Sequence, residues 1–333
     1  MKTFLLATAA ASAAIMCPSA WAQNAEHPDT VVGGIEYHYE DSIAITEEDS
    51  LDATRTVTVK GYVATALTQA GRRLEHVVIG PSVDGVPVEA VGDSLFMGNT
   101  SIRSLRLVGV SRVGQRSFHG CANLGSVDLG EDLLLMGVSA FEGCTGLYSV
   151  SVPRQTNVVG QGAFRGCKGV EYVYLDGPEV VQEDAFAGCE NLRMVLVGPD
   201  VKGVRSQAFA DCPNLRVLAF NNDCEPGLFP FAWGLATDAF TGMPDGSIVV
   251  HAPEKYRGVS GNPYVQMAED PRYTKFAKNV VYDGTTGVEG IEADAEAPAR
   301  YFTPGGVEVS ADDMAPGLYI VLKGGRAAKV LVR

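Results

Sequence analysis

The stretch from Val91 to Phe220 repeats one pattern six times: VGDSLFMGNTSIRSLRL, VGQRSFHGCANLGSVDL, MGVSAFEGCTGLYSVSV, VGQGAFRGCKGVEYVYL, VQEDAFAGCENLRMVLV and VRSQAFADCPNLRVLAF. Each copy contains a phenylalanine, at positions 96, 118, 141, 164, 186 and 209, so the copies are 22 or 23 residues apart. A constant period in this range is typical of a solenoid, in which each unit buries its apolar side only against its neighbours. The chain is therefore predicted to be a β-rich solenoid.

The two halves of a copy predict the shape of one turn. The second half alternates in the manner of Leu-x-x-Val-x-Leu, which predicts a short half-buried strand. The first half is short and rich in glycine, which favours either a second extended piece or a single helical turn before a tight corner. Successive turns should stack about 4.8 Å apart, the spacing of strands in a sheet. Phenylalanine should then lie over phenylalanine and cysteine over cysteine.

A Leu-x-x-Val-x-Leu strand joined to Gly-x-x-Ala-Phe-x-Gly-Cys at this period resembles the BspA-like leucine-rich repeat family. The likeness covers roughly residues 77–250, and the asparagine that follows the strand in ordinary leucine-rich repeats is absent here. The resemblance implies a right-handed solenoid, on secreted or surface-attached proteins of host-associated bacteria, some of which bind host matrix proteins. It implies no catalytic residues.

The chain divides into six segments by composition and period. We expect a signal peptide, an N-terminal β cap, the leucine-rich repeat solenoid with an insertion near 221–235, a C-terminal cap, an acidic linker and a small β tail. These segments are 1–22, 23–76, 77–250, 251–284, 285–298 and 299–333. The caps cover the open ends of the solenoid.

Both ends of the chain indicate export. Lys2, an apolar run and the small-x-small sequence Ala20-Trp21-Ala22 are the parts of a secretory signal peptide. No later stretch is apolar enough to cross a membrane as a helix. The tail resembles the sorting signals of the type IX secretion route through Pro316–Val321 and Lys329–Arg333, although it is shorter than the full signal; a small accessory hairpin is the alternative. The predicted location is secreted or on the outer cell surface.

The charge and the cysteines restrict the function further. Removal of the signal peptide changes the net charge from −14 to −15, because that segment holds one basic and no acidic residue. An acidic protein of this kind is not expected to bind nucleic acid.

Five cysteines, at 121, 144, 167, 189 and 212, occupy one slot of consecutive turns, so their side chains should point in parallel into the core and stay reduced. Cys224 alone lies outside the register and is the candidate for a disulfide.

The sequence contains no motif of an enzyme. The five histidines are scattered along the chain without metal-ligand spacing, and no phosphate-binding loop or nucleophile elbow is present. A repeated array also gives equivalent residues one repeated environment, whereas a catalytic group needs a unique one. We therefore predict a non-enzymatic monomer without cofactor or metal, which binds a protein ligand such as a host matrix protein. The alternative is a structural surface-layer or scaffold protein without a specific ligand.

Alternation within each strand predicts where a ligand would bind. The third and fifth positions of each strand pattern should face away from the core, and they change from polar in the first three copies to apolar in the last three. The insertion adds three aromatic residues, and insertions in repeat proteins often lie on the binding face. The candidate partner-binding residues are Tyr172, Tyr174, Met194, Leu196, Phe229, Phe231 and Trp233. The alternative is that the insertion or the C-terminal cap folds back over this face.

Overall fold

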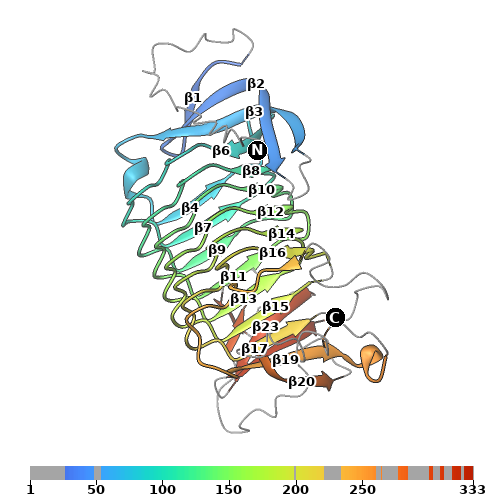
Figure 1. The fold of residues 1–333 in the computed structure, drawn as a ribbon. Helices are drawn as coiled ribbons and strands as arrows, with labels where there is room; N and C mark the ends of the chain where they lie inside the picture. Colours follow the sequence, from blue (N-terminus) through green and yellow to red (C-terminus); the bar gives the residue numbers. More distant parts are fainter. Residues whose placement is uncertain are drawn as a thin grey trace, which may run out of the picture.

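In the computed structural model the chain is a stack of flattened turns with a β cap at the N-terminal end (Figure 1). The structure describes residues 27–48, 54–198, 200–220, 234–259, 264, 277–283, 300–302, 308–310, 317–323 and 326–332. The predicted signal peptide, most of the insertion and the acidic linker lie outside these residues.

Each turn of the solenoid contributes one strand to each of two sets, which we call the longer and the shorter strands after their lengths in the middle of the stack. The longer strands are β4 (His76–Ile79), β7 (Ser104–Leu107), β9 (Ser126–Asp128), β11 (Ser149–Val152), β13 (Tyr172–Leu175), β15 (Met194–Val197), β17 (Val217–Phe220) and β19 (Ile248–Pro253). The shorter strands are β6 (Val86–Val91), β8 (Arg112–Val113), β10 (Leu135–Met136), β12 (Val158–Val159), β14 (Val180–Val181), β16 (Gly203–Val204) and β18 (Gly234–Leu235). The glycine-rich half of each copy is thus a short extended piece followed by turns, which decides between the two alternatives left by the sequence.

Strands of successive turns pair in parallel and form two walls. The shorter strands lie in one sheet in the order β6-β8-β10-β12-β14-β16-β18. The longer strands form the sheets β4-β7-β9 and β11-β13-β15-β17-β19-β20, where β20 (Ala277–Asp283) belongs to the predicted C-terminal cap. This cap therefore continues a wall of the solenoid by one more parallel strand.

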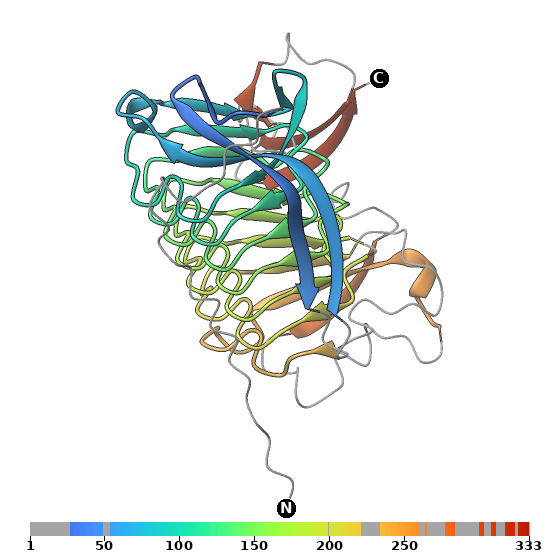
Figure 2. The same ribbon diagram turned by 90° about the horizontal axis from the view of Figure 1, so that it is seen from above.

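The N-terminal cap extends only one of the two walls. It consists of β1 (Thr30–Val32), β2 (Ile35–Glu48) and β3 (Thr54–Leu67), joined antiparallel, and β3 pairs in parallel with β6. The alternating residues Ile35, Tyr37 and Tyr39 are buried, as their spacing predicts. Figure 2 shows the long β2–β3 hairpin crossing the end of the stack. Short elements complete this end and the opposite one: β5 (Ser82–Val83), the 3-10 turn η2 (Gly71–Arg73) and the 3-10 turn η3 (Glu254–Tyr256).

The tail forms a separate antiparallel sheet with the order β22-β21-β23-β24. Its strands are β21 (Arg300–Phe302), β22 (Glu308–Val309), β23 (Gly317–Lys323) and β24 (Arg326–Val332). The sequence predicts a small β tail here. Its shortest strand, β22, has two residues, which is too short for alternation to reveal it.

Stacked phenylalanines form the centre of the core. Neighbouring rings from Phe96 to Phe240 have centroids 5.0–5.5 Å apart and planes within 12° of parallel. The backbone holds the same ladder, because the N–H of each phenylalanine donates to a carbonyl of the next turn, as from Phe141 to Ala163 at 2.7 Å. In the first five copies the glycine two residues after the phenylalanine has φ between 67° and 74°, a left-handed conformation that glycine adopts without strain. The ladder predicted from the sequence is thus present.

The five cysteines of the repeats are free and buried, as predicted. Their thiols do more than fill space, because each lies within hydrogen-bonding distance of the phenylalanine carbonyl of the preceding turn. The Sγ to O distances are 3.1 Å from Cys121 to Phe96, from Cys144 to Phe118 and from Cys167 to Phe141, then 3.4 Å from Cys189 to Phe164 and 3.3 Å from Cys212 to Phe186. Burial raises the pKa of the Cys167 thiol to about 12, so this group stays protonated and able to donate.

Phe164→Ala should lower the free energy of unfolding by on the order of 3–5 kcal/mol, the usual cost of removing a large aromatic side chain from a core. Phe96→Ala should cost less, because Phe96 contacts a ladder ring on one side only. Chemical denaturation of the two variants measures the difference. Equal losses would contradict a ladder that is stabilised from both sides.

Thiol labelling should find Cys121, Cys144, Cys167, Cys189 and Cys212 unreactive in the folded protein at pH 8, because burial keeps all five from the reagent and raises the pKa of every one of them except Cys121. After denaturation without reductant, all five should react. Mass spectrometry of the labelled peptides identifies each site. Pairing of these cysteines with one another would refute the prediction.

Candidate protein-interaction surface

The register of the longer strands brings the predicted outward residues into two straight columns. Ser149 pairs with Tyr172, Tyr172 with Met194, and Met194 with Val217. The second column runs through Ser151, Tyr174, Leu196 and Ala219 in the same way. In the upstream sheet Ser104 pairs with Ser126, and Arg106 with Asp128. We call Tyr172, Tyr174, Met194, Leu196, Val217 and Ala219 the apolar outer patch.

The residues between these columns face the core, as the alternation requires. Val150, Val173, Val195 and Leu218 are buried and belong to the hydrophobic core cluster of the solenoid. The residues of the apolar outer patch do not belong to that cluster. The patch therefore lies on the other face of the sheet, where its side chains are not needed to fill the core.

The apolar outer patch is nevertheless shielded from solvent. Tyr172 is 8% exposed, Leu196 4% and Ala219 0%, while Tyr174, Met194 and Val217 are half-buried. Because none of these side chains is packed into the core cluster, they are covered from outside the solenoid. The tail sheet β21–β24, red in both views, overlaps strands β13–β17 in Figure 1 and lies along the side of the stack in Figure 2. The tail sheet is thus placed where it can cover the patch.

Within the apolar outer patch, the surroundings of Tyr172 shift the pKa of its phenol. Burial raises the pKa of its phenol above the ordinary value, and the Glu171 carboxylate raises it further. Its ring lies 5.7 Å from that of Tyr148, in a tilted arrangement that favours aromatic contact. Tyr172 is therefore a neutral, packed aromatic group at the upper end of the patch.

The upstream part of the same face is polar and open. Arg106 Nε lies 3.4 Å from Asp128 Oδ2, and Arg103 Nε lies 3.2 Å from Glu75 Oε2, each pair linking neighbouring turns. His76 Nδ1 lies 2.8 Å from Ser104 Oγ. Exposed ion pairs of this kind contribute little to stability. Neither core packing nor the stability of these ion pairs therefore explains why the outward residues change from polar to apolar along the solenoid.

Phe229, Phe231 and Trp233 lie outside the described residues, so the structure does not place them against the patch. The other four candidate residues do lie together, in adjacent positions of β13 and β15. The described residues contain no cluster of three or more histidine, cysteine, aspartate or glutamate side chains that could hold a metal. Within the same residues no helix has the length and apolar character of a membrane span.

Residues 89–216 match the model of the BspA type leucine rich repeat region, in six copies. The repeats of this chain belong to that family. No curated protein matches the chain at a significant level. Among solved structures, 15 chains match.

Three of these solved structures show the range of the likeness. A leucine rich repeat protein of T. pallidum is 28% identical, with 53% of this chain and 78% of that chain covered and a TM-score of 0.43. A leucine-rich repeat protein of Eubacterium ventriosum is 18% identical, with 54% and 46% covered and a TM-score of 0.46. A leucine rich cell surface protein of Faecalibacterium prausnitzii is 13% identical, with 77% and 95% covered and a TM-score of 0.30.

Leu196→Asp should loosen the tail sheet from the solenoid without unfolding the repeats, because it buries a charge on the outer face and leaves the core cluster intact. Hydrogen exchange should become faster in residues 317–332 and stay slow around the phenylalanine ladder. Ser126→Asp, in the open part of the columns, is the matched control and should change neither region. Equal loss of protection in the tail and the ladder would instead place Leu196 in the core.

Proposed function

We propose that the chain is a secreted or outer-surface protein that binds a protein ligand, such as a component of the host matrix, through the apolar outer patch. The observation that carries the proposal is a set of aligned apolar side chains that the core does not use. Aligned tyrosine, methionine and leucine side chains provide the large contact areas that dominate protein interfaces. Membership of the repeats in the BspA-type family supports an interaction role.

A ligand that uses the patch must compete with whatever shields it. Tyr172 and Leu196 are buried in the described state, whereas Tyr174 and Met194 keep part of their surface. The half-buried pair provides a first contact, and the buried pair becomes available when the tail sheet is displaced. The composition of residues 285–298, which is glycine, alanine, threonine, proline and acidic residues, predicts a linker between the solenoid and the tail.

The test uses the full chain with a specific protease site placed in residues 285–298, so that the tail is cut from the already folded solenoid. Binding to a panel of purified extracellular-matrix proteins is measured before and after cleavage. We expect cleavage to strengthen binding to at least one of them by about tenfold or more, because the patch no longer has to be uncovered first. Tyr172→Ser combined with Tyr174→Ser should remove that binding, and Ser126→Ala should leave it unchanged.

The alternative function is a structural surface-layer or scaffold protein without a specific ligand, in which the patch serves only to hold the tail sheet. The burial of Tyr172 and Leu196 favours this alternative. Absence of binding to every matrix protein, both before and after cleavage, would support it. Binding that survives the double tyrosine variant would show that the ligand uses another surface.

A further inference from the structure

The N-terminal end of the solenoid is capped on one wall and open on the other. Beyond β6 the wall of shorter strands continues through β3, β2 and β1. The wall of longer strands ends at β4, which pairs only with β7 among the described strands. None of the described strands therefore occupies the position above β4, at the height of the cap.

The hydrogen-bond pattern between β4 and β7 shows which backbone N–H and C=O groups of β4 point to this open edge. The carbonyls of Glu75 and Ile79 accept from the N–H groups of Arg103 and Val108, on the side of β7. Alternate residues of a strand point their N–H and C=O groups to opposite edges. His76 and Val78 therefore present two N–H and two C=O groups to the open edge, and no described strand pairs with them.

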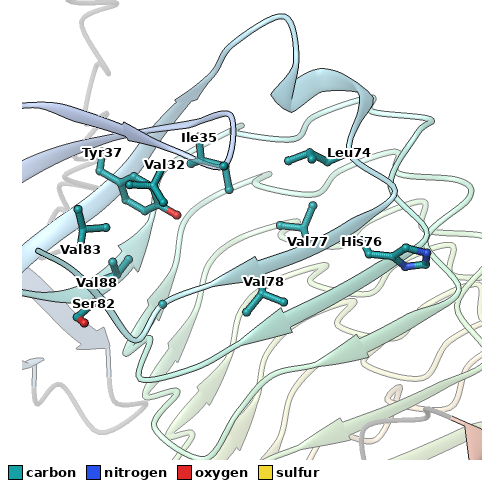
Figure 3. A pocket seen from close by; sticks show the side chains of 12 residues that line it. Val32, Ile35, Tyr37, Leu74, His76, Val77, Val78, Ser82, Val83 and Val88 are labelled. Carbon is teal, nitrogen blue, oxygen red and sulfur yellow. The ribbon is translucent and has the colours of Figure 1, made fainter. Parts of the chain in front are cut away.

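A cavity of about 320 Å³ adjoins this edge (Figure 3). It lies between β4 and the cap, with Val77 on its floor and Tyr37, Val83 and Val88 along one side. The full lining is Val32, Gly33, Ile35, Tyr37, Leu74, His76, Val77, Val78, Gly80, Ser82, Val83 and Val88. Its position above Val77 is where a further turn would place an inward apolar side chain.

The rim of the cavity is unusual for this protein in two respects. Val32 and Val78 are exposed apolar residues beside it, and Val78 is 59% exposed. Arg72 and Arg73 directly precede the lining residue Leu74, are exposed, and have no ion-pair partner among the described residues. In a chain of net charge −14, two unpaired arginines create a local site for negative charge.

We propose that the open edge of β4 is a second binding site, which takes an extended peptide of a partner protein by strand addition. The backbone of the peptide pairs with His76 and Val78, one apolar side chain enters the cavity above Val77, and an acidic residue lies beside Arg72 and Arg73. Strand addition derives its affinity from backbone hydrogen bonds and its selectivity from pockets for alternate side chains. The partner is thus a protein with an exposed segment in which valine or isoleucine alternates with acidic residues. This site goes beyond the apolar outer patch, because the two lie at different ends of the solenoid.

The probe for the test is a fluorescent peptide, Asp-Val-Thr-Val-Glu-Val with blocked ends, titrated with the full-length chain and followed by fluorescence anisotropy. A second peptide of the same sequence carries N-methyl groups at alternate backbone nitrogens, on the edge that would face β4. We expect the first peptide to bind and the methylated peptide to bind at least about tenfold more weakly, because methylation removes the pairing donors and keeps the side chains. Equal binding of the two peptides would overturn strand addition.

Val78→Pro tests the same edge from the protein side. It removes an N–H that β7 does not use, and proline is tolerated on an edge strand where its nitrogen faces outward. We expect binding to fall by about fivefold, the effect of one net hydrogen bond, relative to the matched control Val78→Ala, which keeps the N–H. Unchanged thermal unfolding of both variants shows that the solenoid is intact, and equal affinity of the two would overturn the proposal.

The charge of the rim is tested by Arg72→Glu combined with Arg73→Glu. This variant should weaken peptide binding and remove most of its dependence on salt concentration. Arg116→Glu, at an exposed corner of a later turn, is the control and should have no effect. Sedimentation of the chain without peptide tests whether a second copy of the chain occupies the edge instead. A dimer that is lost in Val78→Pro but kept in Val78→Ala would show that it does, and would overturn the proposal of a separate partner protein.

Discussion

The structure depends on one constraint: no single turn of about 23 residues can bury its own apolar side chains. A turn contributes one phenylalanine, one cysteine and a few aliphatic residues to the core, and each of these is covered only by the equivalent residues of the turns on either side. The backbone obeys the same constraint, because many strand and corner N–H groups donate to a carbonyl of a neighbouring turn, as Phe141 does to Ala163 and Gly125 does to Arg103. Stability is therefore a property of the stack, and it is weakest at the ends.

The cysteines show how this constraint selects residue types. The position directly after the corner glycine is fully buried, and it faces a phenylalanine carbonyl of the preceding turn. A small apolar residue fills the slot, and a thiol also reaches the carbonyl with a weak hydrogen bond. This accounts for a column of reduced cysteines in a chain whose ends resemble those of exported proteins.

Both proposed binding sites lie on surfaces that are not used in stacking one turn on the next. The outer face of the longer strands is not needed by the core, so its side chains are free to differ from turn to turn, and they change from ion pairs around Arg106 to apolar residues around Leu196. The first longer strand, β4, has an edge with which no described strand pairs, since the described strands of the cap extend the other wall. A ligand at the outer patch competes with the cover over Tyr172, whereas a ligand at β4 would complete a wall.

The sequence alone determined the solenoid, its period, the two ladders and the inward or outward direction of each strand residue, because all of these follow from local alternation and from a repeat that can be read directly. It also placed Tyr172, Tyr174, Met194 and Leu196 side by side, since equal positions in equal turns must stack. Only the tertiary structure decided that Tyr172 and Leu196 are covered, that the cap continues one wall and not the other, and that a cavity lies beside the open edge of β4. These features arise where segments outside the repeat meet it, and no periodic pattern encodes contacts between a repeat and a segment that occurs once.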